Sequence, residues 1–371
     1  MAIVVLSLSV SETEQRIRSR RIVNFERNDS MKLITVEEHF TAQEIIDENS
    51  KFSDTSDFYK SMVFVGGALL DAGEGRLSFM DNHKITMQVL SYTSPVSENV
   101  PASEAVRICR RANDILAEKV KANPERFAAF ATLPMADPEA AAAEFERCVK
   151  ELHFCGALLA GQFKGHFYEE ERFFPIFAKA AELDVPVSFH PAPINPAVQD
   201  YYYTSPEYSQ FVAGQFASAG FGWHVDVGIH EVRLILSGIF DKLPNLKIIA
   251  GHWGETIPAY LERLDYMLPP QTTGLRKKVS DYYKENFYIT PSGILSPAQF
   301  EYMVKLMGAE HILWAVDYPY IREGDFYGLL MNAEFLTQEQ KELIAHKNAE
   351  RILRVNGHAL NPDLISGANR D

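Results

Sequence analysis

From residue 32 onward, eight short runs of strand-forming residues alternate with segments that have a helical pattern. Several of these runs are apolar without polar alternation, as expected of strands that are covered on both faces. Eight strands that alternate with helices favour a (β/α)8 barrel, or TIM barrel, in a single α/β domain over an open doubly wound sheet. The first run is also not followed by the G-x-G-x-x-G turn of a dinucleotide-binding fold. The predicted strands are Leu33–His39, Ile85–Tyr92, Phe127–Leu133, Gly156–Ala160, Pro186–His190, Leu246–His252, Phe287–Thr290 and Ile312–Asp317.

Helical segments lie between the predicted strands. Asp137 and Ser296 each precede a proline, which is the pattern of a capping residue followed by the first helical position. The stretch Ala192–Gly222 is rich in Tyr, Pro, Ser and Gly, and it is expected to be a loop over the mouth of the barrel. Apolar spacing of three to four residues, or a high alanine content, predicts helices over Ser103–Val120, Pro138–Leu152 and Glu170–Leu183.

The two ends of the chain fall outside this pattern. The apolar run Ala2–Val10 is followed, not preceded, by arginines, which is the wrong order for a secretion signal. We therefore expect residues 1–30 to be a non-catalytic extension, residues 31–357 to form the barrel domain and residues 358–371 to be a tail.

Charge and cysteine content restrict the partners and the location of the protein. The 36 Lys and Arg residues and the 50 Asp and Glu residues give a formal net charge of −14, which disfavours binding to nucleic acid or to an anionic membrane surface. No stretch approaches the roughly 18–20 uninterrupted apolar residues that a membrane span requires. The three cysteines show no C-x-x-C spacing and cannot all pair. A reducing, cytoplasmic location without a membrane or nucleic-acid partner is therefore expected.

Residues that can bind a metal ion fall at the ends of the predicted strands. Glu37 and His39 lie two positions apart at the end of the first strand, so alternation points both side chains to one face. His190 ends the fifth strand, His252 the sixth and Asp317 the eighth. In a barrel these strand ends meet on the face that carries the active site, and carboxylate together with imidazole suits a divalent ion such as Zn or Mn.

Each of these residues taken alone also has a structural interpretation. A Glu-x-His pair is common, His190 precedes a proline, and Asp317 could start a turn. His252 could hydrogen-bond only to the backbone. The joint placement at four strand ends is what favours a metal site. The remaining histidines fall mostly on predicted helices or loops and are expected to be structural: His83, His153, His166, His224, His230, His311, His346 and His358.

Seven segments of the chain resemble those of the amidohydrolase superfamily. Within it, they are most similar to the metal-dependent aromatic acid decarboxylases, a group that includes γ-resorcylate (2,6-dihydroxybenzoate) and 2,3-dihydroxybenzoate decarboxylases. The resemblance extends from Met31 to about Gly357 and implies that this barrel is a catalytic domain of the amidohydrolase type. The segments are Val36–Phe40, Met80–Ser91, Arg110–Glu118, Leu183–Pro191, Ser237–Asp241, Gly251–Glu255 and Val316–Pro319.

The resemblance implies a set of metal ligands. Glu37, His39, His190 and Asp317 match the residues that bind one divalent ion, Zn or Mn, in the family. Other amidohydrolases bridge two metal ions with a lysine on the fourth strand. The fourth predicted strand contains no lysine, so a mononuclear site is expected.

The resemblance also implies catalytic residues. Asp317 matches the aspartate that is thought to protonate the ring carbon of the substrate before carbon dioxide leaves. His252 matches a histidine that lies beside the metal and is oriented by a carboxylate, here Glu255. Arg263, eleven residues beyond His252 on the following helix, matches an active-site arginine, although Glu262 and Asp265 around it are also typical of a solvated helix face.

Three features depart from the family pattern near the substrate. Ala160 replaces an asparagine that many members carry at the end of the fourth strand, and Tyr320 replaces a phenylalanine after the aspartate ligand. The tyrosines of Tyr201–Tyr203 have no evident counterpart. These changes leave the metal ligands in place, but they leave the identity of the aromatic acid open.

The sequence therefore predicts a metal-dependent, non-oxidative decarboxylase of a hydroxylated aromatic acid, a carboxy-lyase whose substrate resembles a dihydroxybenzoate. The alternative is a metal-dependent hydrolase, similar to a lactonase or an amidase, because one fold supports many reactions. A binding protein without catalysis is disfavoured because the ligand set is complete. The resemblance also implies a homodimer or a homotetramer.

Overall fold

The computed structural model describes residues 31–52, 65–93 and 100–355. The predicted extension over residues 1–30, the predicted tail over residues 358–371 and His358 lie outside the described residues. The strands are β1 (Ile34–Phe40), β2 (Met87–Tyr92), β3 (Phe127–Ala129), β4 (Ala157–Ala160), β5 (Val187–His190), β6 (Ile248–Ala250) and β7 (Phe287–Ile289). All neighbours pair in parallel, in the orders β1–β2–β3 and β4–β5–β6–β7.

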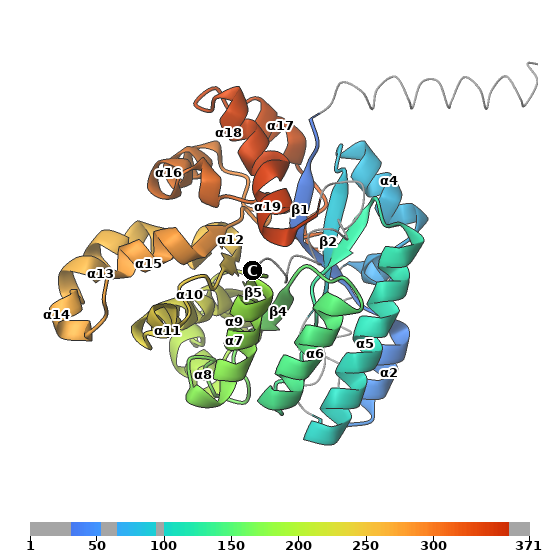
Figure 1. Cartoon of the computed structure of the whole chain (residues 1–371), viewed down its shortest axis with the longest axis horizontal. Helices are drawn as coiled ribbons and strands as arrows, with labels where there is room; N and C mark the ends of the chain where they lie inside the picture. The colour runs from blue at the N-terminus through green and yellow to red at the C-terminus, as the bar shows by residue number, and fades with distance from the viewer. Residues whose placement is uncertain (1–30, 53–64, 94–99, 356–371) are drawn as a thin grey trace, which may run out of the picture.

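Backbone contacts outside the regular strands close these two runs into one ring. Ala131, just after β3, pairs with Ala157 of β4. The segment 312–318 occupies the eighth position: it pairs with β7 at Ile312 and with β1 at Trp314. Figure 1 shows the strands at the centre of a ring of helices. The predicted (β/α)8 barrel is confirmed.

The eighth position differs from the predicted continuous strand Ile312–Asp317. It is an extended segment with isolated bridges. The amides on both sides of Asp317 donate to the side chain of Glu38 instead of to a neighbouring strand, from Val316 at 2.9 Å and from Tyr318 at 3.2 Å. Asp317 itself has a φ of 70°, which an extended strand cannot contain. The ladder is therefore interrupted at Asp317, one of the predicted site residues.

Helices surround the barrel and also cover its ends. The regular helices are α2 (Gln43–Ser50), α4 (Glu74–Asn82), α5 (Ala102–Ala122), α6 (Pro138–Lys150), α7 (Phe174–Leu183), α8 (Pro196–Tyr203), α9 (Gln210–Ala217), α10 (Gly222–Leu236), α11 (Ile239–Lys242), α12 (Gly251–Glu255), α13 (Leu261–Met267), α14 (Pro270–Thr273), α15 (Val279–Asn286), α16 (Pro297–Met307), α17 (Phe326–Met331), α18 (Gln338–Glu342) and α19 (Asn348–Leu353). Shorter or irregular turns are η1 (Gly66–Leu69), η2 (Glu171–Phe173), η3 (Ile257–Tyr260), η4 (Ala309–His311) and η5 (Leu343–Lys347).

Capping explains where several helices begin. The side chain of Asp137 accepts a hydrogen bond from the amide of Ala140 at the start of α6, and that of Ser296 accepts one at the start of α16. Both starts agree with the prediction, and α5 and α6 lie within two residues of their predicted bounds. Helix α7 begins later than predicted, because the tight turn η2 occupies the residues before it.

The stretch Ala192–Gly222 is not the predicted loop, because it contains the two helices α8 and α9. Asn195 caps α8 and is followed by a proline at the first helical position, while Ser209 caps α9. These are the same signals that predict α6 and α16. The many aromatic and small residues of this stretch are typical of a loop, whereas the two capping residues indicate helices.

Strands β3 and β6 are shorter than predicted. Strand β3 ends at Ala129, and the chain then makes only one further bridge, at Ala131. Strand β6 ends at Ala250, because His252 and the four residues after it have left-handed φ angles. Across the residues that the structure describes, no helix has the length and apolarity needed to cross a membrane.

Two layers of apolar side chains hold the barrel together. One layer lies between the strands and the surrounding helices and includes Phe145 and Phe177, both fully buried. The other contains side chains from one face of most of the strands, together with residues of helix α19. It consists mainly of Ile34, Val36, Met87, Val89, Ala128, Phe130, Leu158, Ile249, Leu313, Ala315, Ile352 and Leu353.

Asn348 provides a test of how α19 closes the barrel. Its fully buried amide donates to the carbonyl of Ala309 at 2.8 Å and to that of Ile312 at 2.9 Å. In Asn348→Ala these buried carbonyl groups lose their donor, so we expect the free energy of unfolding to fall by about 2–4 kcal/mol. Urea unfolding measures this loss. The exposed Asn332 supplies the control: Asn332→Ala should change stability by less than about 0.5 kcal/mol, and equal losses would refute the assignment.

Candidate metal centre and active site

Four of the residues that the sequence singles out converge at the ends of the strands. One ligand atom from each of Glu37, His39, His190 and Asp317 lies within 4.8 Å of those of the other three. Nε2 of His39 is 3.1 Å from Oδ1 of Asp317, and Nε2 of His190 is 3.6 Å from Oε1 of Glu37. The side chains of His190 and Asp317 are 11% and 14% exposed, whereas His39 is fully buried. The cluster is therefore accessible from the side of His190 and Asp317.

A bulge in β1 explains how this strand supplies two ligands. Residues Thr35 and Glu38 lie three apart, but their partners in β2 lie two apart, so β1 contains one extra residue. Without it, strict alternation would place Glu38 on the same face as Val36. With it, Glu37 and His39 join the cluster and Glu38 turns toward the surrounding helices.

The polar atoms of the cluster have the properties of a metal site. Oε1 of Glu37, both ring nitrogens of His39 and Oδ1 of Asp317 are buried and have no hydrogen-bond partner. The Nδ1–H of His190 donates to the carbonyl of Pro191 at 2.7 Å, which leaves Nε2 with a free lone pair. Such atoms rarely stay unpaired in a protein interior. A divalent cation fits this set because it would satisfy all four side chains.

The two imidazoles of the cluster are held neutral, which is the form that binds a metal. Burial lowers the pKa of His39 to about 4. Burial, and then the neighbouring His39, lower the pKa of His190 to about 3. Neither ring is positively charged near neutral pH, so neither repels a cation, and each ring keeps one nitrogen with a lone pair that can bind it.

Hydrogen bonds fix the Glu37 carboxylate. Its Oε2 accepts from the hydroxyl of Thr290 at 3.3 Å and from that of Ser292, and the two hydroxyls are 2.7 Å apart. Gly251 packs against the same oxygen: a Cβ at this glycine would lie 2.8 Å from Oε2. Sequence reasoning did not identify these three residues. The only sequence feature that could have identified them is their position directly after β6 and β7, where strand ends meet on the same face of the barrel.

Glu38 holds the strained backbone of Asp317. Its carboxylate accepts from the amides of Val316 and Tyr318 and from the side chain of Gln88, which in turn accepts from the guanidinium of Arg76. Arg76 also donates to the carbonyl of His39. One buried network therefore fixes the backbone at two of the ligands. Strained residues of this kind concentrate at functional sites.

His252 and Glu255 lie on a left-handed turn that follows β6. The φ angles of residues 252–256 are all positive, between 46° and 73°, and four of these five residues are not glycine. The turn brings Nδ1 of His252 to 2.7 Å from Oε1 of Glu255 and directs Nε2 toward Glu37, whose Oε1 is 3.8 Å away. Trp253 anchors the turn, because its fully buried indole donates to the carbonyl of Ile294.

The charges around His252 favour its protonated form. Burial opposes this form, but Glu255 and then Glu37 outweigh it and raise the pKa of His252 to about 10. Glu255 has the opposite shift: burial opposes its charge, yet His252 and His224 hold its pKa below the usual value. The pair therefore forms a buried imidazolium and carboxylate.

His224 also belongs to this site, although it was expected to be structural. Its Nδ1 is 2.8 Å from Oε2 of Glu255, and its ring centre is 4.3 Å from that of His252. His224 lies on α10, 31 residues before Glu255. Nothing in the local sequence links it to a strand end, so the pattern that identified the other residues could not identify it.

Arg263, predicted as an active-site arginine, lies exposed on α13, outside the cluster. Leu261 on the same helix is buried, and a position two residues further along points to the opposite side. Within this chain, the exposed Arg263 side chain therefore does not lie with the other predicted site residues.

Two of the residues that depart from the family pattern, Ala160 and Tyr320, lie next to residues of the cluster. Tyr320 packs its ring 5.3 Å from that of His39, and its hydroxyl is 2.6 Å from Oγ1 of Thr93. Ala160 pairs with His190 in the neighbouring strand. The tyrosines 201–203 lie on α8, where Tyr203 is buried and the other two are exposed.

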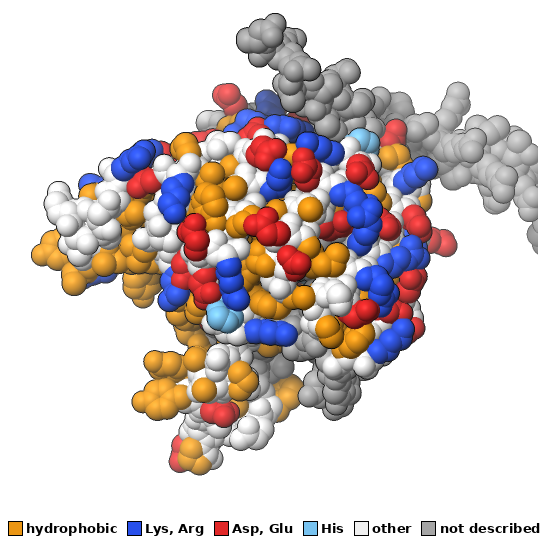
Figure 2. All heavy atoms as spheres, turned by 60° about the horizontal axis from the view of Figure 1, so that its bottom comes forward, with side chains coloured by type: hydrophobic (Ala, Val, Ile, Leu, Met, Phe, Trp, Pro, Cys, Tyr) orange, Lys and Arg blue, Asp and Glu red, His pale blue; other side chains and the backbone are white. Residues whose placement is uncertain are grey.

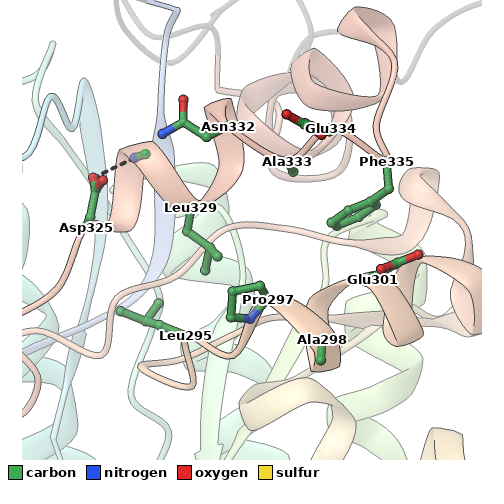
Figure 3. Close-up of a pocket in the computed structure, with 11 residues that line it drawn as sticks. Leu295, Pro297, Ala298, Glu301, Asp325, Leu329, Asn332, Ala333, Glu334 and Phe335 are labelled. Carbon is green, nitrogen blue, oxygen red and sulfur yellow. Dashed lines mark hydrogen bonds between the residues drawn. The ribbon is translucent and has the colours of Figure 1, made fainter.

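A surface hollow between α16 and α17 is separate from this site (Figure 3). Leu295, Pro297, Leu329 and Phe335 line it, and none of the strand-end ligands does. Its lining is mainly apolar, with a few carboxylates at the edge.

Comparisons with known proteins agree with this geometry. A family model described as amidohydrolase matches residues 66–355. The chain is 36% identical to decarboxylase orsB of Emericella nidulans, over 87% of this chain and 97% of that protein. It is 34% identical to the γ-resorcylate decarboxylase of Rhizobium radiobacter, over 87% of this chain and 98% of that protein.

A solved structure gives the same result. The dihydroxybenzoic acid decarboxylase of Polaromonas, solved with bound manganese and the inhibitor 2-nitroresorcinol, has a TM-score of 0.76 and 31% sequence identity. The match covers 88% of this chain and 97% of that chain. The chain belongs to the amidohydrolase family, in the group of aromatic acid decarboxylases.

Gly251 tests whether the position of Glu37 controls metal binding. Gly251 does not have a positive φ, so its backbone tolerates alanine. In Gly251→Ala the new methyl group would lie too close to Oε2 of Glu37 and must displace the carboxylate. We expect metal affinity to fall about 10–100-fold while the fold is retained. Metal titration by calorimetry, with circular dichroism as the check on folding, measures this. Unchanged affinity would show that Glu37 does not bind the metal. Gly214→Ala, where the methyl group meets open space, is the control.

Proposed function

We propose that this protein is a metal-dependent, non-oxidative decarboxylase of a hydroxylated aromatic acid. The observation that carries the proposal is the cluster of buried ligand atoms without hydrogen-bond partners at the strand ends, next to the charged pair of His252 and Glu255. Membership of the decarboxylase group supports it. The hydrolase alternative is not favoured, because these relatives are named as decarboxylases.

Glu37, His39, His190 and Asp317 would hold one divalent ion. Zn and Mn both suit two imidazoles and two carboxylates, and manganese in the related Polaromonas structure supports Mn. When bound, the cation would hold the carboxylate and the adjacent hydroxyl oxygen of the substrate and offset their charge.

Asp317 would supply the proton. An aryl anion is too unstable to leave directly, so the ring carbon that carries the carboxylate must be protonated first. Without a metal ion, burial raises the pKa of Asp317 to about 7, so the site itself disfavours the ionised form of this side chain. After the transfer, the bond to the carboxylate breaks, its electrons restore the aromatic ring, and carbon dioxide leaves.

His252 would balance charge beside this step. Its Nε2 faces the cluster with a proton that Glu255 and Glu37 stabilise. A positive group in this position favours an anionic substrate. The Tyr320 hydroxyl and the small Ala160 would shape the pocket for a dihydroxybenzoate-like acid.

We also propose self-association as a homodimer or a homotetramer, in the cytoplasm. Large apolar side chains are exposed on α8, α9 and α13, among them Tyr201, Phe211, Tyr266 and Met267. The projection at the left of Figure 2, where Figure 1 places α13 and α14, carries several hydrophobic side chains. Surfaces of this kind often mark interfaces. The three cysteines are buried and form no disulfide, as is usual in a reducing compartment.

Asp317→Asn tests the source of the proton. The amide keeps an oxygen ligand of nearly the same shape but has no carboxylic acid proton. We expect the metal to be largely retained while decarboxylation falls about 10²–10⁴-fold, the usual contribution of general acid catalysis. Carbon dioxide release from a panel of hydroxybenzoates, together with metal analysis, measures both quantities. In deuterium oxide, the wild-type product should carry one deuterium in place of the carboxylate.

A control and a contrary outcome complete this test. Asp325→Asn changes a helix cap remote from the cluster and should leave turnover unchanged. If excess metal restores the activity of Asp317→Asn, with deuterium incorporated at the normal rate, then Asp317 is a ligand only. His252 would then be the next candidate for the acid.

A further inference from the structure

The Glu255 carboxylate is divided between two imidazoles. Oε1 faces Nδ1 of His252 at 2.7 Å, and Oε2 faces Nδ1 of His224 at 2.8 Å. Glu255 is 1% exposed, so water does not replace either partner. Each oxygen depends on a different histidine, and removal of His224 would leave Oε2 without its nitrogen donor in a buried position.

The surroundings of His224 fix which nitrogen carries the proton. Its Nε2 is 3.0 Å from Nε1 of Trp223, which can only donate, and 3.1 Å from the carbonyl of Ala219, which can only accept. A neutral ring that accepts from Trp223 has its proton on Nδ1, and a charged ring that donates to Ala219 has protons on both nitrogens. In both states the Nδ1–H donates to Glu255. In the remaining state, a neutral ring with its proton on Nε2, the lone pair of Nδ1 would face a lone pair of the Glu255 carboxylate.

His224 also connects the left-handed turn to a separate element. Helix α10 contacts Glu255 twice: through the His224 side chain, and at Gly228, where a Cβ would lie 2.8 Å from the Glu255 carbonyl oxygen. The His224 ring stands edge-on to that of His252, with an angle of 61° between the planes. The orientation of His252 therefore depends on α10 as well as on the turn that carries it.

We propose that His224 is a positioning residue for the decarboxylation proposed above. It holds the Glu255 carboxylate in the orientation in which Glu255 fixes the Nδ1–H of His252 and leaves Nε2 directed at the substrate. His224 acts through Glu255: its hydrogen-bond partners are Trp223, Glu255 and Ala219, and none of them is a proposed metal ligand. The proposal rests on the proposed function for its effect on turnover, but the contact itself does not depend on any substrate.

Two variants of His224 test this role. His224→Phe keeps a ring but removes the donor, so we expect kcat to fall about 10–100-fold, the range for a hydrogen bond to a charged group, while KM changes less than about 3-fold. His224→Asn places an amide nitrogen where the imidazole has Nδ1, and it should restore kcat to within about 3-fold of wild type. A residue needed only for packing would not show this split or this rescue.

A matched control is His346→Phe. His346 also lies beside a carboxylate, with Nδ1 3.1 Å from Oε2 of Glu350 but without a hydrogen bond to it, and its side chain is 14% exposed compared with 16% for His224. It lies in η5, remote from the cluster, so its loss should leave kcat unchanged. An equal fall of kcat in both variants would overturn the proposal.

A double-mutant cycle separates this proposal from the proposed function. If His224 acts through Glu255, His224→Phe should have little further effect on kcat in a Glu255→Gln background. The same cycle on the free energy of unfolding needs no substrate and should also show coupling. Additive effects of the two substitutions on stability would overturn the contact between His224 and Glu255. Failure of the wild-type chain to decarboxylate any acid in the panel would refute the proposed function, but it would leave the stability test of the contact intact.

Metal analysis excludes the competing use of the same side chains. His224, His252 and Glu255 are close enough together to bind an ion themselves. We expect one metal ion per chain in the wild type and in His224→Phe. Two ions in the wild type and one in the variant would make His224 a ligand and overturn the positioning role.

Discussion

The burial of polar ligand atoms without hydrogen-bond partners is the constraint on which the rest of the site depends. An ionised carboxylate in a protein interior costs roughly several kcal/mol unless it is paired. Oε1 of Glu37 and Oδ1 of Asp317 face imidazole nitrogens that burial keeps neutral, so the protein supplies no positive charge among the four ligands themselves. A divalent cation bound to these four side chains would resolve this imbalance.

Several irregularities of the backbone serve this one arrangement. The bulge in β1 turns Glu37 and His39 inward, the left-handed φ of Asp317 interrupts the eighth strand, and the turn after β6 is left-handed over five residues. Specific contacts hold two of them: Glu38 at Asp317, and the Trp253 indole in the turn. The positions of the four proposed ligands and the orientation of His252 therefore depend on contacts outside this set.

The sequence predicts the barrel and the ligand cluster because both follow from periodic patterns. Apolar runs between helices give the strand order, and the strand ends then place Glu37, His190 and Asp317 on one face. The pattern fails where side chains compete with the backbone ladder. Glu38 takes the amides around Asp317, so the last predicted strand is broken, and the cap at Asn195 begins a helix inside the predicted loop. His224 was missed because its role depends on the packing of α10 against a turn far along the chain. Arg263 was placed by resemblance alone, and its helix turns it outward.

The most direct test of the account is a metal titration of the stripped protein, followed by carbon dioxide release from ortho-hydroxylated benzoates. The account predicts no turnover without metal, and turnover that rises in proportion to bound Mn or Zn until one ion is present per chain. Full turnover in metal-free protein would contradict it, as would turnover that requires a second ion.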